Sequence, residues 1–304
     1  MWVLFAFVSS VFLGFYDISK KKSLNDNAVL TVLFFNTVFC ALIFIPVVYL
    51  SSVFPTVLRG TLFNASLCDN FTDIEQYKAH ILVIIKSFIV LSSWILGYYS
   101  LKHLPITIAG PINALRPVVV LLGAILLFDE KLNIIQWGGI IISILSLFLL
   151  SLSSKKEGIY FLNNKWIYIL FGAVFMGAIS GLYDKYIMNQ LPPLFVQSWF
   201  NIYQVPIMGT VLLIMNRFTT SKFHWKWWIP FISIFISIAD FAYFYSLSCE
   251  GALISVVSMI RRGSVIISFT AGAILFKEKN LKYKAVDLIL IIIGLILLCW
   301  GSLI

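Results

Sequence analysis

Charged residues are scarce in this 304-residue chain: Asp, Glu, Lys and Arg make up 12% of it, whereas 61% of the residues are hydrophobic. Soluble domains carry about 25% charged and about 45–50% apolar residues, so the composition excludes an ordinary soluble protein. The mean hydropathy of +0.98 is typical of a chain that crosses a membrane several times.

Motifs that carry common enzymatic or energy-coupling chemistry are also lacking. The sequence contains no Gly-x-x-x-x-Gly-Lys-Ser/Thr loop, no His-Glu-x-x-His and no Gly-x-Ser-x-Gly. Its four cysteines show no metal-ligand spacing, and no signal-peptide cleavage site follows the first apolar run. The histidines fall at or beyond predicted helix ends: His80, His103 and His224. We therefore expect no cofactor, no direct use of ATP and no intramembrane enzyme, which is the rival class of function.

Long apolar runs dominate what is present. Most reach the roughly 17–25 residues that a helix needs to span a bilayer, and only 51–79 forms a long connection. The predicted helices are residues 2–19, 28–50, 80–101, 106–128, 134–152, 166–188, 195–215, 227–247, 252–275 and 285–302.

Four short motifs occur once in each half of the chain, in the same order. They are Gly14–Asp17 and Gly181–Asp184, Phe35-Asn36 and Phe200-Asn201, Tyr98–Leu101 and Phe244–Leu247, and Phe128–Lys131 and Phe276–Lys279. A duplicated unit with an odd number of spans inserts its copies in opposite senses. The fold class predicted is an all-α polytopic membrane protein with ten transmembrane helices as two inverted five-helix repeats, residues 1–153 and 154–304, with the substrate site between them.

Lysine and arginine are distributed unevenly between the two sides of the predicted bundle. One side holds Arg59, Lys78 and Lys131. The other holds Lys20, Lys21, Lys22, Lys102, Lys155, Lys156, Lys165, Arg217, Lys222, Lys226, Lys277, Lys279, Lys282 and Lys284. The positive-inside rule makes the second side cytoplasmic and puts both termini outside, in the plasma (inner) membrane. Membrane orientation thus accounts for the net charge of +9, which does not indicate a nucleic-acid partner.

Two arginines lie near the middle of predicted spans. A charge at the bilayer centre costs at least about 2.5–3.5 kcal/mol on insertion scales. Arg116 and Arg262 are related by the 146-residue offset between Ser100 and Ser246, so we expect them to be copies of one ancestral position. A guanidinium group grips carboxylate or phosphate with two hydrogen bonds, which predicts an anionic or zwitterionic ligand. The alternative is that each arginine pairs internally and only holds the bundle together.

Other charges inside the spans suggest further roles. Lys86 is deep enough to favour a cavity role over snorkelling to the surface, and Asp240 is its candidate counter-charge. Asp240 occurs in one half only, so it is the predicted coupling residue that takes up and releases a proton, or else it neutralises an arginine. Asp17 and Asp184, near helix ends, are expected to contact Lys20 or Lys185 and water.

Several uncharged residues complete the predicted substrate-binding set. Gln197, Asn201 and Gln204 share one helical face that should point inward, toward a cavity or a partner helix. Asn113 lies three residues before Arg116, and Trp199 is deep enough to line a cavity, although packing explains it equally well. Pro111 and Pro117 bracket Asn113 and should bend this helix.

The chain resembles the EamA-type carriers of the drug/metabolite transporter superfamily over nearly its whole length. The resemblance rests on the stretches Leu104–Pro117 with Asp129-Glu130-Lys131, Gln136–Gly139, and Ser258–Ser264 with Phe276–Lys279. It implies ten helices in a five-plus-five repeat and alternating-access transport of a small metabolite, without naming the substrate. It also implies that Glu130 and Glu278 are structural residues at helix ends.

We therefore predict a secondary transporter of a small polar organic metabolite that is anionic or zwitterionic. Its predicted partners are that small-molecule substrate and the lipid bilayer, with the protein a monomer or homodimer. Two alternatives stay open. An exporter of cationic or aromatic compounds would use Asp240 and the aromatic residues, and a membrane scaffold or sensor would transport nothing.

Overall fold

A computed structural model describes residues 2–54, 65, 73–128, 133–155, 159–216, 222–249, 252, 254–278 and 281–301. Within these ranges the chain is helical and contains no strand. The predicted motif residues Asp129, Glu130, Lys131 and Lys279 lie outside them.

The described residues of the first half form the α-helices α1 (Trp2–Leu24), α2 (Val29–Val53), α4 (Asp73–His103), α5 (Ile106–Ala114), α6 (Arg116–Phe128) and α7 (Ile134–Lys155). The second half forms the short 3-10 helix η1 (Phe161–Asn163), then α8 (Lys165–Met188), α9 (Pro193–Asn216), α10 (Trp228–Ser248), α11 (Ile254–Arg262), α12 (Ser264–Ile274) and α13 (Leu281–Gly301). Every predicted apolar segment coincides with one of these helices or with a consecutive pair.

Eight helical stretches of the described chain are long and apolar enough to cross a membrane, and α11 with α12 counts as one of them. Two further apolar stretches, Ile106–Leu122 and Ile134–Leu150, are shorter. Large apolar side chains cover the outside of these helices, for example Phe148, Phe175 and Ile296, as expected of surfaces that face lipid. The chain is therefore an integral membrane protein.

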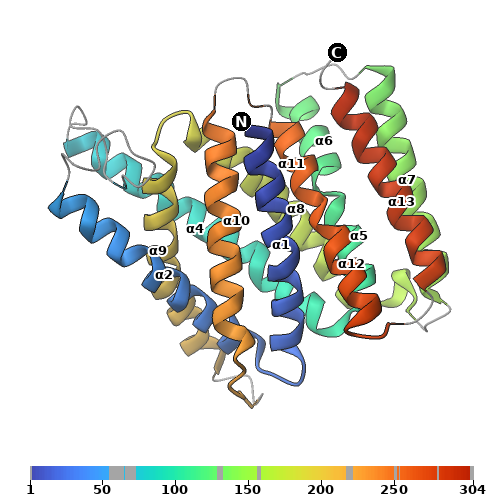
Figure 1. Cartoon of the computed structure of the whole chain (residues 1–304), viewed down its shortest axis with the longest axis horizontal. Helices are drawn as coiled ribbons and strands as arrows, with labels where there is room; N and C mark the ends of the chain where they lie inside the picture. Colours follow the sequence, from blue (N-terminus) through green and yellow to red (C-terminus); the bar gives the residue numbers. More distant parts are fainter. Residues whose placement is uncertain are drawn as a thin grey trace.

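The helices pack as pairs that join the two halves of the chain. The most extensive contacts are α1 with α10, α4 with α8, α2 with α9 and α7 with α13. In Figure 1, α2 and α9 lie at one side of the bundle together with the beginning of α4, whereas α7 and α13 lie at the opposite side, and α1, α8 and α10 lie between them. The N-terminal end of α1 and the C-terminal end of α13 lie at the same end of the bundle (Figure 1).

The fourth and ninth predicted segments are each broken near the middle. Leu115 separates α5 from α6, and Gly263 separates α11 from α12. The N–H groups of Leu115 and Val118 donate to carbonyls three residues earlier, and so do those of Gly263 and Ile266. Pro117 contributes to the first break, because a proline has no N–H group to donate to the carbonyl four residues earlier, that of Asn113. The second break contains no proline and has the same hydrogen-bond pattern.

Glu278 joins the second half of the chain to the start of α5. Its carboxylate accepts hydrogen bonds from the backbone N–H groups of Ile106 (2.8 Å) and Thr107 (3.0 Å) and from the Thr107 hydroxyl. The Thr107 hydroxyl in turn accepts from Lys284 Nζ at 3.0 Å. Pro105, which precedes α5, offers no side-chain cap, so Glu278 satisfies N–H groups that the helix itself leaves free.

Candidate functional site

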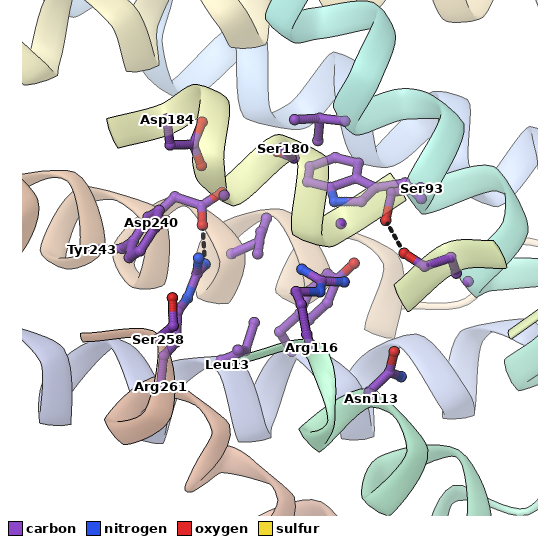
Figure 2. A pocket seen from close by; sticks show the side chains of 18 of the residues that line it. Leu13, Ser93, Asn113, Arg116, Ser180, Asp184, Asp240, Tyr243, Ser258 and Arg261 are labelled. Carbon is purple, nitrogen blue, oxygen red and sulfur yellow. Dashed lines mark hydrogen bonds and ion pairs between the residues drawn. The ribbon is translucent and has the colours of Figure 1, made fainter. Parts of the chain in front are cut away.

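A polar cavity of about 120 Å³ lies inside the bundle, between helices of both halves. Side chains from α1, α4, α5, α6, α8, α9, α10 and α11 line it. Figure 2 shows Arg116 and Arg261 entering from one side, with Asp184 and Asp240 opposite. Along α4 the lining runs from Lys86 to Tyr98, which at 1.5 Å per residue is about 18 Å.

Asp17 and Lys20 form an ion pair at the Tyr98 end of the cavity. Lys20 Nζ lies 2.8 Å from an Asp17 carboxylate oxygen, which confirms the predicted contact between Asp17 and Lys20. The same ammonium group lies over the rings of Tyr16, 4.3 Å from the centroid, and Tyr98, 5.4 Å from the centroid. A cation over an aromatic face is stabilised by the ring quadrupole.

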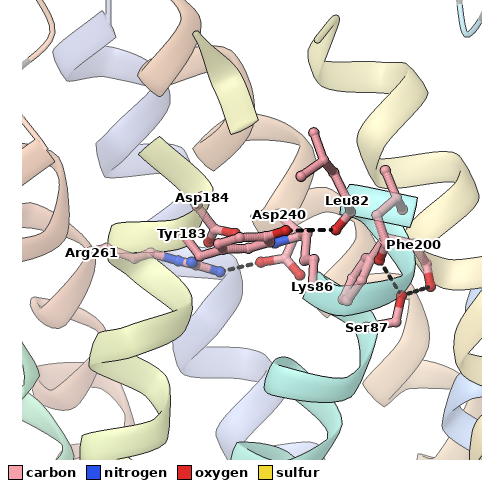
Figure 3. A network of polar contacts seen from close by, with 9 residues as sticks. Leu82, Lys86, Ser87, Tyr183, Asp184, Phe200, Asp240 and Arg261 are labelled. Carbon is pink, nitrogen blue, oxygen red and sulfur yellow. Dashed lines mark hydrogen bonds and ion pairs between the residues drawn. The ribbon is translucent and has the colours of Figure 1, made fainter. Parts of the chain in front are cut away.

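Lys86 and Asp184 form a second, more deeply buried ion pair at the other end of the cavity. Lys86 also lies over the rings of Phe200 (4.9 Å) and Phe244 (4.7 Å). Both predicted partners were wrong: Lys86 does not pair with Asp240, and Asp184 contacts neither Lys185 nor open water, since its side chain is only 7% exposed. Figure 3 shows Asp184 between Lys86 and the Arg261 side.

Asp240 pairs instead with Arg261, the arginine adjacent to Arg262. The Arg261 guanidinium carbon lies 4.1 Å from the centroid of the Tyr243 ring, which fixes this side chain against α10. Figures 2 and 3 show the Arg261 side chain directed at Asp240. Asp240 therefore neutralises an arginine, which is one of the two roles predicted for it. The proton-coupling role stays a prediction.

Arg116 lines the centre of the cavity from the first residue of α6. Its guanidinium group lies against Gly177 of α8, in the space that a Cβ atom at this glycine would occupy. Its Nε atom is buried without an acceptor, and no carboxylate of the described chain forms an ion pair with it. Glycine at 177 is thus what lets the arginine head reach the cavity.

Arg262 also lines the cavity, from the last residue of α11. Its Nε is likewise buried without an acceptor, and it has no ion pair within the described ranges. The equivalence with Arg116 stays a prediction. Relative to the two helix breaks, at Leu115 and Gly263, Arg116 follows its break and Arg262 precedes its own. The two arginines thus reach one cavity from opposite sides of their breaks.

Among the other predicted binding residues, Asn113 lines the cavity and three do not. Gln197 donates to the Ser237 carbonyl of α10 at 2.9 Å, whereas Asn201 donates to the Gln197 carbonyl of its own helix, α9, at 2.8 Å. The Trp199 ring packs on His80 and Tyr203, with centroids 4.7 and 5.6 Å away. An inward-facing amide can hydrogen-bond to the protein itself as well as to a ligand. The helical periodicity of Gln197 and Asn201 therefore could not show whether they line the cavity.

The sequence reasoning missed Asp184, Lys20 and Tyr98 as cavity residues. A signal existed, because Asp17 and Asp184 end the repeated Gly-x-Tyr-Asp motif and Tyr98 matches Phe244 in the repeat. Each repeated aspartate pairs with a lysine that lies over one of these matched rings, at opposite ends of the cavity. The described residues contain no cluster of three His, Cys, Asp or Glu side chains that would suit a metal ion.

The sequence profile of the EamA-like transporter family matches residues 1–152 and residues 164–300. The chain belongs to the EamA-like transporter family. It is thereby a membrane transporter of the drug/metabolite transporter superfamily, as the resemblance implied. No curated protein sequence matches it significantly.

A solved crystal structure has the same fold as this EamA-like transporter. Its TM-score is 0.62 at 13% sequence identity, over 97% of this chain and 95% of the other. At this identity the similarity concerns the fold alone. The lining of its own cavity carries more positive than negative side chains.

Proposed function

We propose that this EamA-like protein is a secondary transporter that moves a small organic anion by alternating access between two inverted five-helix repeats, residues 1–153 and 154–304. The observation that carries the proposal is a cavity between helices of both halves in which Arg116 and Arg262 have no carboxylate partner. A guanidinium fork facing a small polar cavity suits carboxylate or phosphate.

The pattern of helix contacts supports the inverted repeat. If α1, α2, α4 and α7 correspond to α8, α9, α10 and α13, then α2–α9 and α7–α13 are pairs of equivalent helices. The contacts of α1 with α10 and of α8 with α4 are then the same contact made twice. A twofold relationship produces this reciprocity. The two family matches, 1–152 and 164–300, divide the chain at the same place.

The two ends of the cavity support alternating access. Asp17 and Asp184 occupy equivalent motif positions, yet lie at opposite ends, as inversion of one repeat requires. Each carries an ion pair beside aromatic rings that would have to separate to open that end. Rocking of the halves about a central site is the mechanism that such repeats support.

The proposed orientation has both termini outside the cytoplasm, in the plasma (inner) membrane, from the excess of lysine and arginine on one side. The test uses a cysteine-free background with Asp73→Cys or Lys222→Cys, at exposed ends of the described chain. A membrane-impermeant maleimide should label position 73 in intact cells and position 222 only after permeabilisation. The reverse pattern would refute the orientation.

Transport is tested in proteoliposomes with purified protein and radiolabelled probes: glutarate, phenyl phosphate, and tetraethylammonium as a cation. We expect uptake of an anion, and we expect Arg262→Ala to abolish it while the protein stays folded by thermal unfolding. Lys222→Ala is the matched control, because it removes one positive charge outside the cavity.

Two outcomes would favour the alternatives. Uptake of the cation alone, unaffected by Arg262→Ala, would support an exporter of cationic compounds. Binding without uptake of any probe, under every imposed gradient, would support a scaffold or sensor. Asp240 argues against the cation reading, since Arg261 already occupies the carboxylate that a cation would need.

A further inference from the structure

The charged residues that line the cavity are unequal in number. Five carry positive charge and three carry negative charge. The cations are Lys20, Lys86, Arg116, Arg261 and Arg262, and the carboxylates are Asp17, Asp184 and Asp240. The lining therefore has two more positive than negative charges.

Every carboxylate of the lining is already used. Each forms one ion pair with one cation: Asp17 with Lys20, Asp184 with Lys86, and Asp240 with Arg261. A cationic group of a ligand would have to break one of these pairs to find a counter-charge. The cavity is thus poorly suited to a cation, and equally to the amino group of a zwitterion.

The excess charge belongs to Arg116 and Arg262. Neither has an ion pair in the part of the chain that the structure describes, and the Nε of each is buried without an acceptor. They approach from different halves, Arg116 from the start of α6 and Arg262 from the end of α11. Two uncompensated charges inside a membrane protein are costly, so a ligand that supplies two negative charges gains most from binding.

We propose that the ligand of this cavity is a dianion, either a phosphate monoester or a dicarboxylate. This inference rests on the proposed transport function and narrows its substrate class. A dianion makes the occupied cavity neutral overall, a monoanion leaves one positive charge, and a zwitterion leaves two. A phosphate monoester can bind both guanidinium forks with one group, whereas a dicarboxylate places one carboxylate on each fork.

The rest of the lining fits a ligand with a short apolar part. Trp94, Phe200 and Phe244 contribute aromatic surface, and Leu13, Val90 and Ile236 contribute aliphatic surface. The small cavity volume, about 120 Å³ as the structure stands, argues for a compact molecule rather than a nucleotide.

The experiment measures equilibrium binding by calorimetry to the full-length protein in lipid nanodiscs at pH 8, where a phosphate monoester is doubly charged. The matched probes are phenyl phosphate against methyl phenyl phosphate, and glutarate against its monomethyl ester. Each pair differs by one negative charge. We expect the dianion of at least one pair to bind about tenfold more tightly than its partner, and about tenfold corresponds to 1.4 kcal/mol.

Arg116→Gln and Arg262→Gln should each remove most of this preference, because one unpaired charge then remains. Lys222→Gln, which removes a charge outside the cavity, should retain it. A monoanion that binds as tightly as its dianion in both pairs would overturn the inference, and so would a preference that survives both arginine substitutions. Should a variant fail to fold, the wild-type probe comparison still decides.

The two proposals fail separately. Preferred binding of a dianion without uptake into proteoliposomes would leave this inference standing and refute transport. Uptake of monoanions at the rate of dianions, with equal affinities, would refute the dianion and leave anion transport standing.

Discussion

The guanidinium group of Arg116 occupies the space above Gly177 in which any larger residue would place its Cβ atom. This contact joins α6 of the first half to α8 of the second, at the centre of the cavity. A side chain at position 177 must therefore displace either the arginine or the helix. The position of an unpaired cation in this protein thus depends on the absence of a side chain on a neighbouring helix.

Gly177→Ala should accordingly weaken anion binding without unfolding the protein. The added methyl group pushes the Arg116 head from its position, and we expect a loss of affinity of about tenfold, or 1.4 kcal/mol. Calorimetry with the tightest-binding anionic probe measures it. Gly172→Ala is the control on the same helix, because its Cβ would meet only Leu96 at an ordinary 3.5 Å. Equal affinities in the two variants would contradict the role given to Gly177.

The pair Lys86–Asp184 yields a stability prediction. Lys86 is 2% and Asp184 is 7% exposed in their side chains, so removing one partner leaves a buried charge without compensation. Lys86→Met should lower the free energy of unfolding by about 3–5 kcal/mol, and the double variant with Asp184→Leu should recover most of it. Thermal unfolding in detergent measures both.

The more exposed pair supplies the comparison. In Asp17–Lys20 the aspartate side chain is 23% exposed, so Lys20→Met should cost clearly less than Lys86→Met. Similar losses of unfolding free energy in Lys20→Met and Lys86→Met would show that burial does not determine how much each ion pair contributes to stability.

Much of the fold is predictable from the sequence, because apolar length and repeated motifs report on helices directly. A bend was predicted in the fourth segment, where Pro111 and Pro117 occur, and none was predicted in the ninth. The break at Gly263 has no proline, so only the structure reveals it.

The sequence could predict which residues face the interior of the bundle, but not which partners they contact there. Arg116, Arg262, Lys86, Asn113 and Asp240 all line the cavity, since a charge or amide deep in a span must face inward. Which residue pairs with which depends on helix rotation, so Asp184 was missed as the partner of Lys86 across 98 positions. Gln197 and Asn201 face inward as well, yet Gln197 donates to α10 and Asn201 donates within its own helix, α9.

Glu278 should matter for stability because it caps a helix in the other half of the chain. Glu278→Ala removes the acceptor for Ile106 N–H, Thr107 N–H and the Thr107 hydroxyl, and we expect a loss of about 1–2 kcal/mol in the free energy of unfolding. Glu278→Gln retains one acceptor oxygen and should lose less. Denaturant unfolding of both variants tests this, and an unaffected alanine variant would contradict the capping role.

Asp240 separates the anion and cation readings of the cavity. Asp240→Asn removes the partner of Arg261 and leaves three unpaired arginines, so the lining becomes more positive by one charge. Anion binding should then tighten by roughly three- to tenfold, or about 0.7–1.4 kcal/mol. Adding Arg261→Gln returns the charge to its original value and should restore the original affinity. If Asp240 binds a cation instead, Asp240→Asn should abolish cation uptake and leave the affinity for phenyl phosphate or glutarate unchanged, which would refute the charge argument.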